Sequence, residues 1–248
     1  CHVLESTPTR LLTVPEAELS EAQWQSFAAL ISRRKQGEPV AYLTGSRGFW
    51  TLDLAVNAST LIPRPDTELL VSLSLPILKP GMRVVDLGTG SGAIALSLAA
   101  EKPDVSFIAT DAVFEALILA RKNAQRHHID NVFFMQMSWL TGFRPGSFDL
   151  IVSNPPYIET ADPHLSQGDV RFEPHTALVS GDDGLEDIRQ IISQARVCLK
   201  NGGWLLVEHG FDQSARVRQL FADAGFDQIT AHRDFGGQDR AVMGQLAL

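Results

Sequence analysis

The stretch "DLGTGSG", residues 86–92, decides the fold class of this chain. It begins at the end of the apolar run "MRVVDL" and precedes a segment of helical character over 91–101. Gly88, Gly90 and Gly92 allow a tight backbone turn and let a ligand approach without meeting a Cβ atom. The helix that starts beyond them offers free backbone N–H groups. The stretch therefore predicts a buried strand, a ligand-binding turn and a helix, in that order.

The same order of strand, turn and helix recurs along the rest of the chain. Apolar runs of strand length alternate with segments of helical length and pattern. We expect strands near 105–110, 131–137, 148–153, 203–209, 226–232 and 240–247, and helices near 112–126, 185–199 and 211–224. Apolar strands that alternate with helices form a mostly parallel sheet with both faces covered. The residues therefore predict an α/β fold.

The part of the chain before the glycine turn follows a different pattern. Ser20 and Gln23 have the spacing of a helix capping box, and apolar residues at helical intervals extend that helix to about residue 35. Residues 40–62 hold short β-prone pieces typical of a hairpin. The stretch "IPRPDTELLVSLSL", 62–75, predicts a turn that enters another helix.

Composition narrows the class of protein. The 29 acidic residues outnumber the 21 Lys and Arg residues, and the net charge of −8 argues against a broad electrostatic grip on nucleic acid. Cys1 and Cys198 form no CxxC motif and no disulfide framework, and neither a signal peptide nor a membrane-spanning run is visible. We therefore expect a cytoplasmic protein that does not contact membranes. Because the first residue is Cys1 rather than methionine, we interpret residues 1–38 as the end of something longer.

The glycine turn and an acid downstream indicate a cofactor that contains adenosine. Gly88, Gly90 and Ala93 satisfy the dinucleotide pattern G-x-G-x-x-A. Asp111 ends the next strand, about 23 residues beyond Gly88, where a carboxylate accepts hydrogen bonds from ribose hydroxyls. This arrangement serves NAD and S-adenosylmethionine alike, so these residues leave the choice open. No HExxH or comparable histidine spacing occurs, and no metal site is predicted.

The stretch "NPPY", Asn154 to Tyr157, favours methyl transfer. Ligands of parallel α/β sheets bind at the carboxyl ends of strands, so this stretch shares an edge with the glycine turn and Asp111. A planar amide or exocyclic amino nitrogen is a poor nucleophile, and two acceptors on its N–H groups push electron density toward a methyl donor. We expect the Asn154 side-chain oxygen and the Pro155 carbonyl to be these acceptors. Pro155 and Pro156 stiffen the loop, and Tyr157 packs on the flat face of the substrate group. No hydride chemistry needs this arrangement, so S-adenosylmethionine is the expected cofactor.

"DLGTGSG", "NPPY" and "LIPRPDTELLV" together resemble the glutamine methyltransferases that modify peptide chain release factors, the PrmC/HemK type. The loop "PHLSQGDVRFEPHTALVSGDDGL", 163–185, and the tail "RDFGGQDRAV" are also similar to that family. The resemblance implies a seven-stranded, Rossmann-like methyltransferase fold joined to an N-terminal helical domain by a β-hairpin. The implied boundaries are 1–38 for the last part of a helical substrate-docking domain, 39–63 for the hairpin linker and 64–248 for the catalytic domain.

The resemblance also implies a reaction and the residues that serve it. Family members use S-adenosylmethionine to methylate the side-chain amide nitrogen (N5) of the glutamine in the Gly-Gly-Gln motif of class-1 release factors, in translation termination, with S-adenosylhomocysteine as product. Family members often carry an acid just before the position of Trp139, where this chain has Ser138. The catalytic and substrate-binding residues carried over are Asn154, Pro155, Pro156 and Tyr157. The cofactor contacts carried over are Gly88, Thr89, Gly90, Ser91, Gly92, Asp111, Asn154 and Trp139, the last beside the adenine.

Other functions are open from the residues alone. Nucleic-acid methyltransferases that act on adenine-N6 or guanine-N2 share the Asn-Pro-Pro-Tyr stretch, although the acidic composition and short loops of this chain do not favour them. A module that binds the cofactor and serves as a scaffold without catalysis is a third hypothesis. An NAD-dependent oxidoreductase ranks last.

Overall fold

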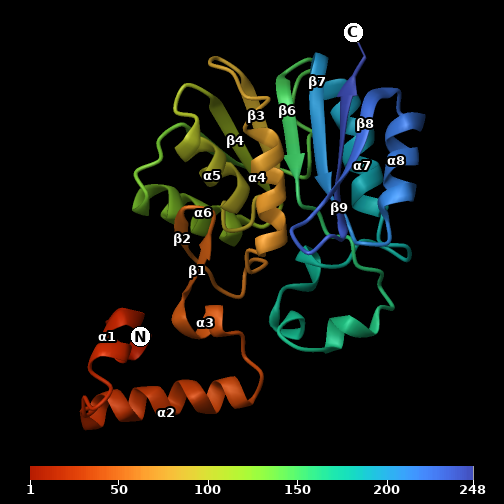
Figure 1. The fold of residues 1–248 in the computed structure, drawn as a ribbon. Coiled ribbons are helices and arrows are strands. Elements are labelled where there is room, and N and C mark those ends of the chain that lie inside the picture. Colours follow the sequence, from red (N-terminus) through yellow and green to blue (C-terminus); the bar gives the residue numbers. More distant parts are fainter. Residues whose placement is uncertain (248) are drawn as a thin grey trace.

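The computed structural model describes residues 1–247, the side chain of Pro8 excepted, and shows an α/β body with a smaller helical part at the N-terminus (Figure 1). A seven-stranded sheet has the order β5-β4-β3-β6-β7-β9-β8. Its strands are β3 (Arg83–Leu87), β4 (Ser106–Asp111), β5 (Val132–Gln136), β6 (Phe148–Ser153), β7 (Leu199–Glu208), β8 (Phe226–Arg233) and β9 (Asp239–Leu246). Strands β3 to β7 are parallel, and β9 runs antiparallel to both of its neighbours. The predicted fold class is confirmed.

Helices cover both faces of the sheet. One face carries α4 (Glu68–Ser74), α5 (Ala93–Glu101) and α6 (Phe114–Arg126), and the other carries α7 (Glu186–Cys198) and α8 (Ser214–Asp223). Successive side chains of a strand point to opposite faces. Val84 of β3 accordingly joins the core beneath α4 and α5, and Val85 joins the core beneath α7. Strands buried on both sides need apolar residues at every position, which explains the continuous apolar runs in the sequence.

The N-terminal part consists of short helices and a hairpin. The helix η1 (His2–Leu4) is followed by α1 (Pro8–Thr13), α2 (Glu21–Lys35) and α3 (Val40–Thr44), and the hairpin pairs β1 (Ser46–Phe49) with β2 (Leu52–Ala55). The predicted capping box at the start of α2 is confirmed, because Gln23 N donates to Ser20 Oγ at 3.2 Å and Ser20 N to Gln23 Oε1 at 2.9 Å. The hairpin lies within the predicted range, but α3 in front of it was not predicted. This helix has five residues and is followed by Gly45 in a left-handed conformation. It is too short for its sequence to show a helical period.

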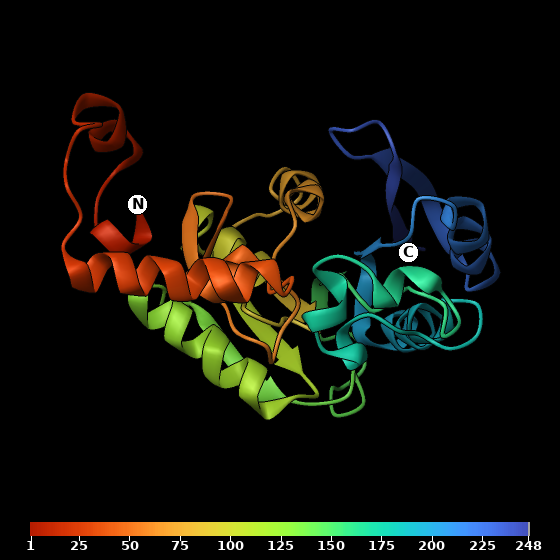
Figure 2. The same ribbon diagram turned by 90° about the horizontal axis from the view of Figure 1, so that it is seen from below.

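The end of α2 is attached to the long loop that follows β6. This loop contains three short helices, η3 (Pro163–Ser166), η4 (Val170–Phe172) and η5 (His175–Ala177). Arg34 forms an ion pair of 2.8 Å with Asp169, and the Arg171 guanidinium donates to the carbonyl of Gln36 at 2.7 Å. Figure 2 shows α2 running across the lower side of the molecule toward this loop. No helix within residues 1–247 is long and apolar enough to cross a membrane.

The chain changes direction in the sheet between β3 and β6. It proceeds outward from β3 to β4 and β5, and then returns to add β6 on the other side of β3. Leu87 and Ser153, the last residues of these two strands, are paired, and Ser153 Oγ donates to the Leu87 carbonyl at 2.8 Å. The glycine turn and Asn154 therefore leave the sheet side by side at its switch point, where ligands of open α/β sheets bind.

Candidate active site

The glycine turn is fastened to the neighbouring strand by its own backbone. Thr89 N donates to the Thr110 carbonyl at 2.9 Å, and Gly90 N donates to Asp111 Oδ2 at 2.9 Å. Gly88 has a φ of 68° and Gly90 a φ of 55°, the left-handed region that favours glycine. A Cβ added at Gly88 would stand 3.5 Å from the Trp139 ring, and one at Gly90 would stand 3.8 Å from Thr60 Cβ. The glycines therefore leave open the space between the turn, Trp139 and the hairpin linker.

Asp86 supports the turn from below. Its Oδ2 accepts hydrogen bonds from Thr89 Oγ1 at 2.6 Å and from Ala95 N at 3.2 Å. The side chain is buried, and Oδ1 has no hydrogen-bond partner within the described residues. Burial raises the pKa of Asp86 to about 7, against the lowering effect of its two donors. Asp86 thus joins the strand, the turn and the first turn of α5 into one unit.

Asp111 connects the glycine turn to the start of α6. Besides Gly90, its carboxylate accepts a hydrogen bond from Val113 N, which lies 2.9 Å from Oδ1. Burial raises the pKa of Asp111, while these backbone N–H groups lower it. Each carboxylate oxygen has two lone pairs, so both oxygens retain an acceptor position for a ligand in the cavity that Asp111 lines.

Trp139 occupies an unfavourable backbone conformation at the same edge. Its φ is 49°, which is rare for a bulky residue and is found mainly where surrounding structure enforces it. The next residue contributes to that constraint, because Leu140 N donates to Gln194 Oε1 at 2.8 Å. The indole faces Gly88, and Ser138 lies beside it on the cavity wall.

Asn154 is held in one orientation by the segment that precedes α4. Its Nδ2 donates to Oγ1 of Thr67 at 3.1 Å, and Thr67 ends the short helix η2 (Pro65–Thr67). Thr67 is buried, with 4% of its surface exposed. With Nδ2 engaged, Asn154 Oδ1 is the atom left to accept a hydrogen bond from a substrate.

A single cavity of about 280 Å³ brings most of these residues together. It opens at the carboxyl ends of β3, β4, β5 and β6 and is closed on one side by the hairpin linker. Eight of the predicted site residues line it, namely Gly88, Thr89, Gly90, Ser91, Asp111, Trp139, Asn154 and Pro156. Within residues 1–247 no cluster of three or more His, Cys, Asp or Glu side chains forms a metal site.

Three predicted site residues lie outside the cavity wall. Gly92 caps the N-terminus of α5, with a φ of 87°. Pro155 is buried, and the role of its carbonyl stays a prediction. The Tyr157 ring packs against the core beneath α7, and its hydroxyl donates to Glu208 Oε1 at 3.3 Å. Contact between Tyr157 and a substrate also stays a prediction, and the structure gives its hydroxyl a partner behind the cavity.

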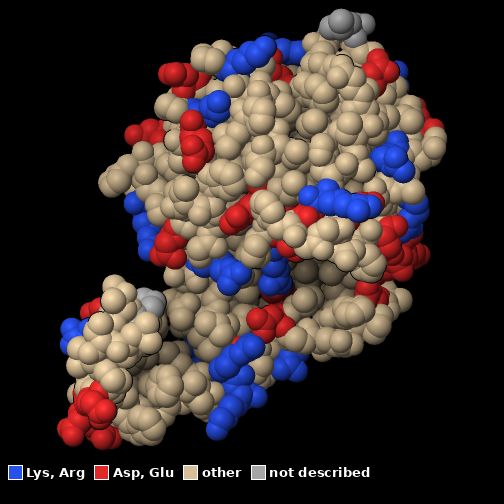
Figure 3. All heavy atoms as spheres, in the orientation of Figure 1, with Lys and Arg blue, Asp and Glu red and all other residues tan. Residues whose placement is uncertain are grey.

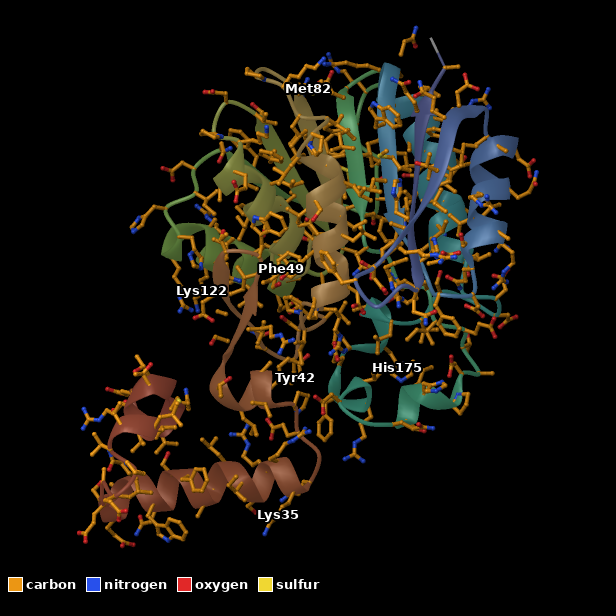
Figure 4. All side chains as sticks on the ribbon, viewed as in Figure 1. Lys35, Tyr42, Phe49, Met82, Lys122 and His175 are labelled. Carbon is orange, nitrogen blue, oxygen red and sulfur yellow. The ribbon has the colours of Figure 1, made fainter. Side chains whose placement is uncertain are left out.

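An ion pair joins the long loop to the segment that precedes η2, beside the cavity. Arg64, which precedes η2, contacts the buried carboxylate of Glu173 in the loop, and Glu173 Oε2 also accepts a hydrogen bond from Ile62 N of the linker at 3.0 Å. Tyr42 of α3 donates to the Thr60 carbonyl at 2.8 Å. Figure 4 labels Tyr42 together with His175 of η5, below the sheet edge. Figure 3 shows a basic group at the nearby end of α2, formed by Arg33, Arg34 and Lys35.

Sequence reasoning missed three polar residues that support the site: Asp86, Thr67 and Glu208. Asp86 stands in the glycine stretch itself, where an acid at the end of a buried strand could have been noticed. Thr67 stands in "PRPDTE" and Glu208 in "LLVEH", but neither has a local spacing that indicates its partner.

Comparison with known proteins places the chain in a family. A family model for the methyltransferase small domain matches residues 65–169, and one for the PrmC N-terminal domain matches residues 1–45. The release factor glutamine methyltransferase of Escherichia coli (strain K12) is 49% identical over 245 residues, which cover 98% of this chain and 88% of that protein. The one from Vibrio cholerae is 51% identical over 248 residues, which cover 99% and 86%.

Solved structures agree at the level of the fold. A methyltransferase from Pyrococcus furiosus superimposes with a TM-score of 0.62 at 18% identity, covering 89% of this chain and 98% of that one. A ribosomal protein L11 methylase from Lactobacillus delbrueckii subsp. bulgaricus gives a TM-score of 0.56 at 24% identity, covering 75% and 81%. Because the curated relatives share about half of their residues with it over nearly their full length, the chain belongs to the release factor glutamine methyltransferase family.

Proposed function

We propose that this protein transfers the methyl group of S-adenosylmethionine to the side-chain amide nitrogen of the glutamine in the Gly-Gly-Gln motif of class-1 peptide chain release factors. The observation that carries the proposal is the position of Asn154. Its free Oδ1 lies at the sheet switch point, in the same cavity as the glycine turn and Asp111. Family membership supports the choice of a glutamine amide over other planar nitrogens.

The residues around the cavity fit an adenosine-containing methyl donor. Gly88 and Gly90 leave the turn without side chains where a Cβ would project toward Trp139 and Thr60. Asp111 retains acceptor positions for two ribose hydroxyls, and the Trp139 indole offers an apolar face for a base. Ser138 lies on the same wall and offers a hydroxyl at the position where family members often carry an acid. When bound there, S-adenosylmethionine supplies an electrophilic methyl group on its sulfonium.

The residues of this chain act on the nucleophile. Asn154 Oδ1 accepts a hydrogen bond from one N–H of the substrate amide, and the Pro155 carbonyl accepts the other, so the nitrogen lone pair is aimed at the methyl group. Orientation of this kind can remove roughly 7–11 kcal/mol of barrier in good cases. As the C–N bond forms and the C–S bond breaks, the nitrogen becomes strongly acidic. It then releases its extra proton to water without a dedicated base, and S-adenosylhomocysteine leaves.

We also propose a division of labour along the chain. Residues 1–38 form part of a helical domain that docks the release factor, 39–63 form the hairpin linker, and 64–248 form the catalytic domain. In support, α2 ends at Lys35 and the hairpin spans 46–55. Since release factors work in translation termination, we propose the cytoplasm as the compartment of the reaction.

Methyl transfer from labelled S-adenosylmethionine tests the proposal directly. A class-1 release factor would be offered beside its Gly-Gly-Gln→Gly-Gly-Ala variant and beside tRNA and duplex DNA. Label on the unaltered release factor alone is the expected result. Label on nucleic acid alone would favour an adenine-N6 or guanine-N2 methyltransferase, and label on the Gly-Gly-Ala variant would move the target to another residue.

A further inference from the structure

A buried chain of polar side chains leads from Asn154 into the protein. Asn154 Nδ2 donates to Thr67 Oγ1 at 3.1 Å. Behind Thr67 stands Glu208, the last residue of β7, with 1% of its surface exposed. The Thr67 hydroxyl lies close enough to the Glu208 carboxylate to lower its pKa, and Glu208 Oε2 is buried with no hydrogen-bond partner within the described residues. Four elements thus contribute to one network, because Tyr157, in the loop after β6, donates to Glu208 Oε1 at 3.3 Å and Arg240 of β9 lies nearby.

The number of protons available fixes which group donates in each hydrogen bond from Glu208 through Thr67 to Asn154. An ionised carboxylate only accepts hydrogen bonds, whereas a hydroxyl has one proton to donate and lone pairs with which to accept. If Thr67 gives its proton to Glu208, it can only accept from Asn154, and the atom of Asn154 that faces it must be Nδ2. Oδ1 then points into the cavity, where the substrate nitrogen needs an acceptor. An asparagine amide has nearly the same shape in either orientation, so its shape alone does not select this one.

We propose that Glu208 is a positioning residue, whose buried carboxylate acts through the Thr67 hydroxyl to keep Asn154 Oδ1 turned toward the substrate amide. The inference rests on the proposed function, because the substrate amide gives the orientation its purpose. It also gives Tyr157 a role that differs from stacking on the substrate. The Tyr157 hydroxyl occupies Oε1 and leaves Oε2, which has no hydrogen-bond partner within the described residues, as the acceptor for the Thr67 hydroxyl.

The network makes methyl transfer depend on pH. Burial raises the pKa of Glu208 to about 7, Thr67, Arg240 and Tyr157 lower it, and Asp66 raises it. Burial also raises the pKa of Tyr157, so its hydroxyl stays protonated and continues to donate. A protonated Glu208 can itself donate a hydrogen bond to Thr67. The Thr67 hydroxyl is then free to donate to Asn154 Oδ1, so the Asn154 side-chain amide can flip. Activity should therefore rise as pH increases through about 7.

Two isosteric variants test the inference, with methyl transfer to a class-1 release factor as the assay. Glu208→Gln can donate to Thr67, and Thr67→Val removes the hydroxyl. Each should lower kcat by about 10- to 100-fold. This is less than the loss caused by removing a hydrogen bond to a reacting group, because Asn154 is still present and only its orientation is less fixed. The dissociation constant of S-adenosylmethionine should change by less than about twofold, because neither change touches the glycine turn or Asp111. Thr67→Ser, which keeps the hydroxyl, should retain most of the activity.

A pH profile and a matched control separate positioning from general damage. Wild-type kcat should fall as pH drops from about 8 to about 6, whereas kcat of Thr67→Val should be flat over that range. Ser74→Ala removes another buried hydroxyl, at the end of α4, and that hydroxyl has no hydrogen-bond partner within the described residues. Its kcat should match the wild type. Thermal melts of all variants check that each is folded.

The outcomes distinguish this inference from the proposed function. If the wild type transfers no methyl group to the release factor, the proposed function fails. If the wild type is active and Glu208→Gln or Thr67→Val retains its kcat and pH profile, the inference alone is overturned. The inference would also be overturned if Thr67→Val lowers kcat but keeps the pH dependence. The group whose titration controls kcat would then not act through Thr67.

Discussion

Replacing Asp111 by asparagine removes a charge from the cavity with little change of shape. The carboxylate accepts one backbone N–H on each oxygen, from Gly90 and Val113, both at 2.9 Å. In Asp111→Asn one of these oxygens becomes an NH₂ group, which is a donor. One of the two backbone N–H groups then loses its acceptor, at a cost of about 1–3 kcal/mol. The glycine turn or the start of α6 should therefore loosen.

The effect on cofactor affinity follows from the same two oxygens. Two ribose hydroxyls would donate to Asp111, and a hydrogen bond to a charged group contributes about 1.5–3 kcal/mol, compared with about 0.5–1.5 kcal/mol for a neutral pair. The difference is about 1–1.5 kcal/mol for each bond and about 2–3 kcal/mol for both. At 1.4 kcal/mol for each tenfold change, the dissociation constant of S-adenosylmethionine should rise about 30- to 150-fold.

Isothermal titration of Asp111→Asn with S-adenosylmethionine measures this change. Asp104→Asn is the matched control, because Asp104 is exposed at the amino-terminal end of β4 and its side chain has no role in the cavity. Affinity of the control should equal that of the wild type. If Asp111→Asn is folded and binds within about twofold of the wild type, the assignment of Asp111 to the ribose is refuted.

Three further changes probe the clamp, the turn and the buried acid. Asn154→Ala should lower kcat for methyl transfer by at least about 100-fold and leave the affinity for S-adenosylmethionine largely intact, and an equal loss of both would contradict a main role of Asn154 toward the substrate. Gly92→Ala places a Cβ 2.8 Å from Leu96 Cδ1 at a φ of 87°, so the free energy of unfolding should fall by about 2–4 kcal/mol. Gly81→Ala, at a φ of 80° with open space around it, should cost only the backbone part in the same thermal melts. Relative to the wild type, Glu208→Gln should have a higher free energy of unfolding at pH 8 than at pH 5. The folded pKa of about 7 exceeds the ordinary 4.5, so the wild type loses up to roughly 3 kcal/mol as pH rises through this window. Identical shifts in melting temperature at the two pH values would be the contrary result.

The parts of the site that could be predicted are those whose chemistry is local in the sequence. The glycine turn is recognisable because Gly88, Gly90 and the adjacent apolar strand are contiguous. Asp111 and Asn154 were placed beside it because both end parallel strands, and parallel strands end at one edge. Seven residues chosen in this way line one cavity, together with Trp139, which the family resemblance indicated.

Thr67 and Glu208 could not be predicted as supporting residues, because their partners are distant along the chain. Thr67 lies 87 positions before Asn154, and Glu208 lies 51 positions after Tyr157. No periodicity relates such pairs, and only the tertiary fold brings them together. The direction of the Tyr157 ring also depends on tertiary packing, because the ring is held by the core beneath α7 and not by its neighbours in the stretch Asn154 to Tyr157.

The two substrates of the proposed reaction are held by structurally different means. In the proposed reaction the methyl donor faces a turn that is fixed to the adjacent strand by hydrogen bonds from Thr89 N to the Thr110 carbonyl and from Gly90 N to the Asp111 carboxylate. The nucleophile faces Asn154, whose orientation depends on a side chain from the segment that enters α4. That segment is joined to the long loop by Arg64 and Glu173, and the loop is joined to α2 by Arg34 and Asp169. The helical part is therefore connected through two ion pairs to the segment that holds Asn154, and Arg64 of that segment also lines the cavity.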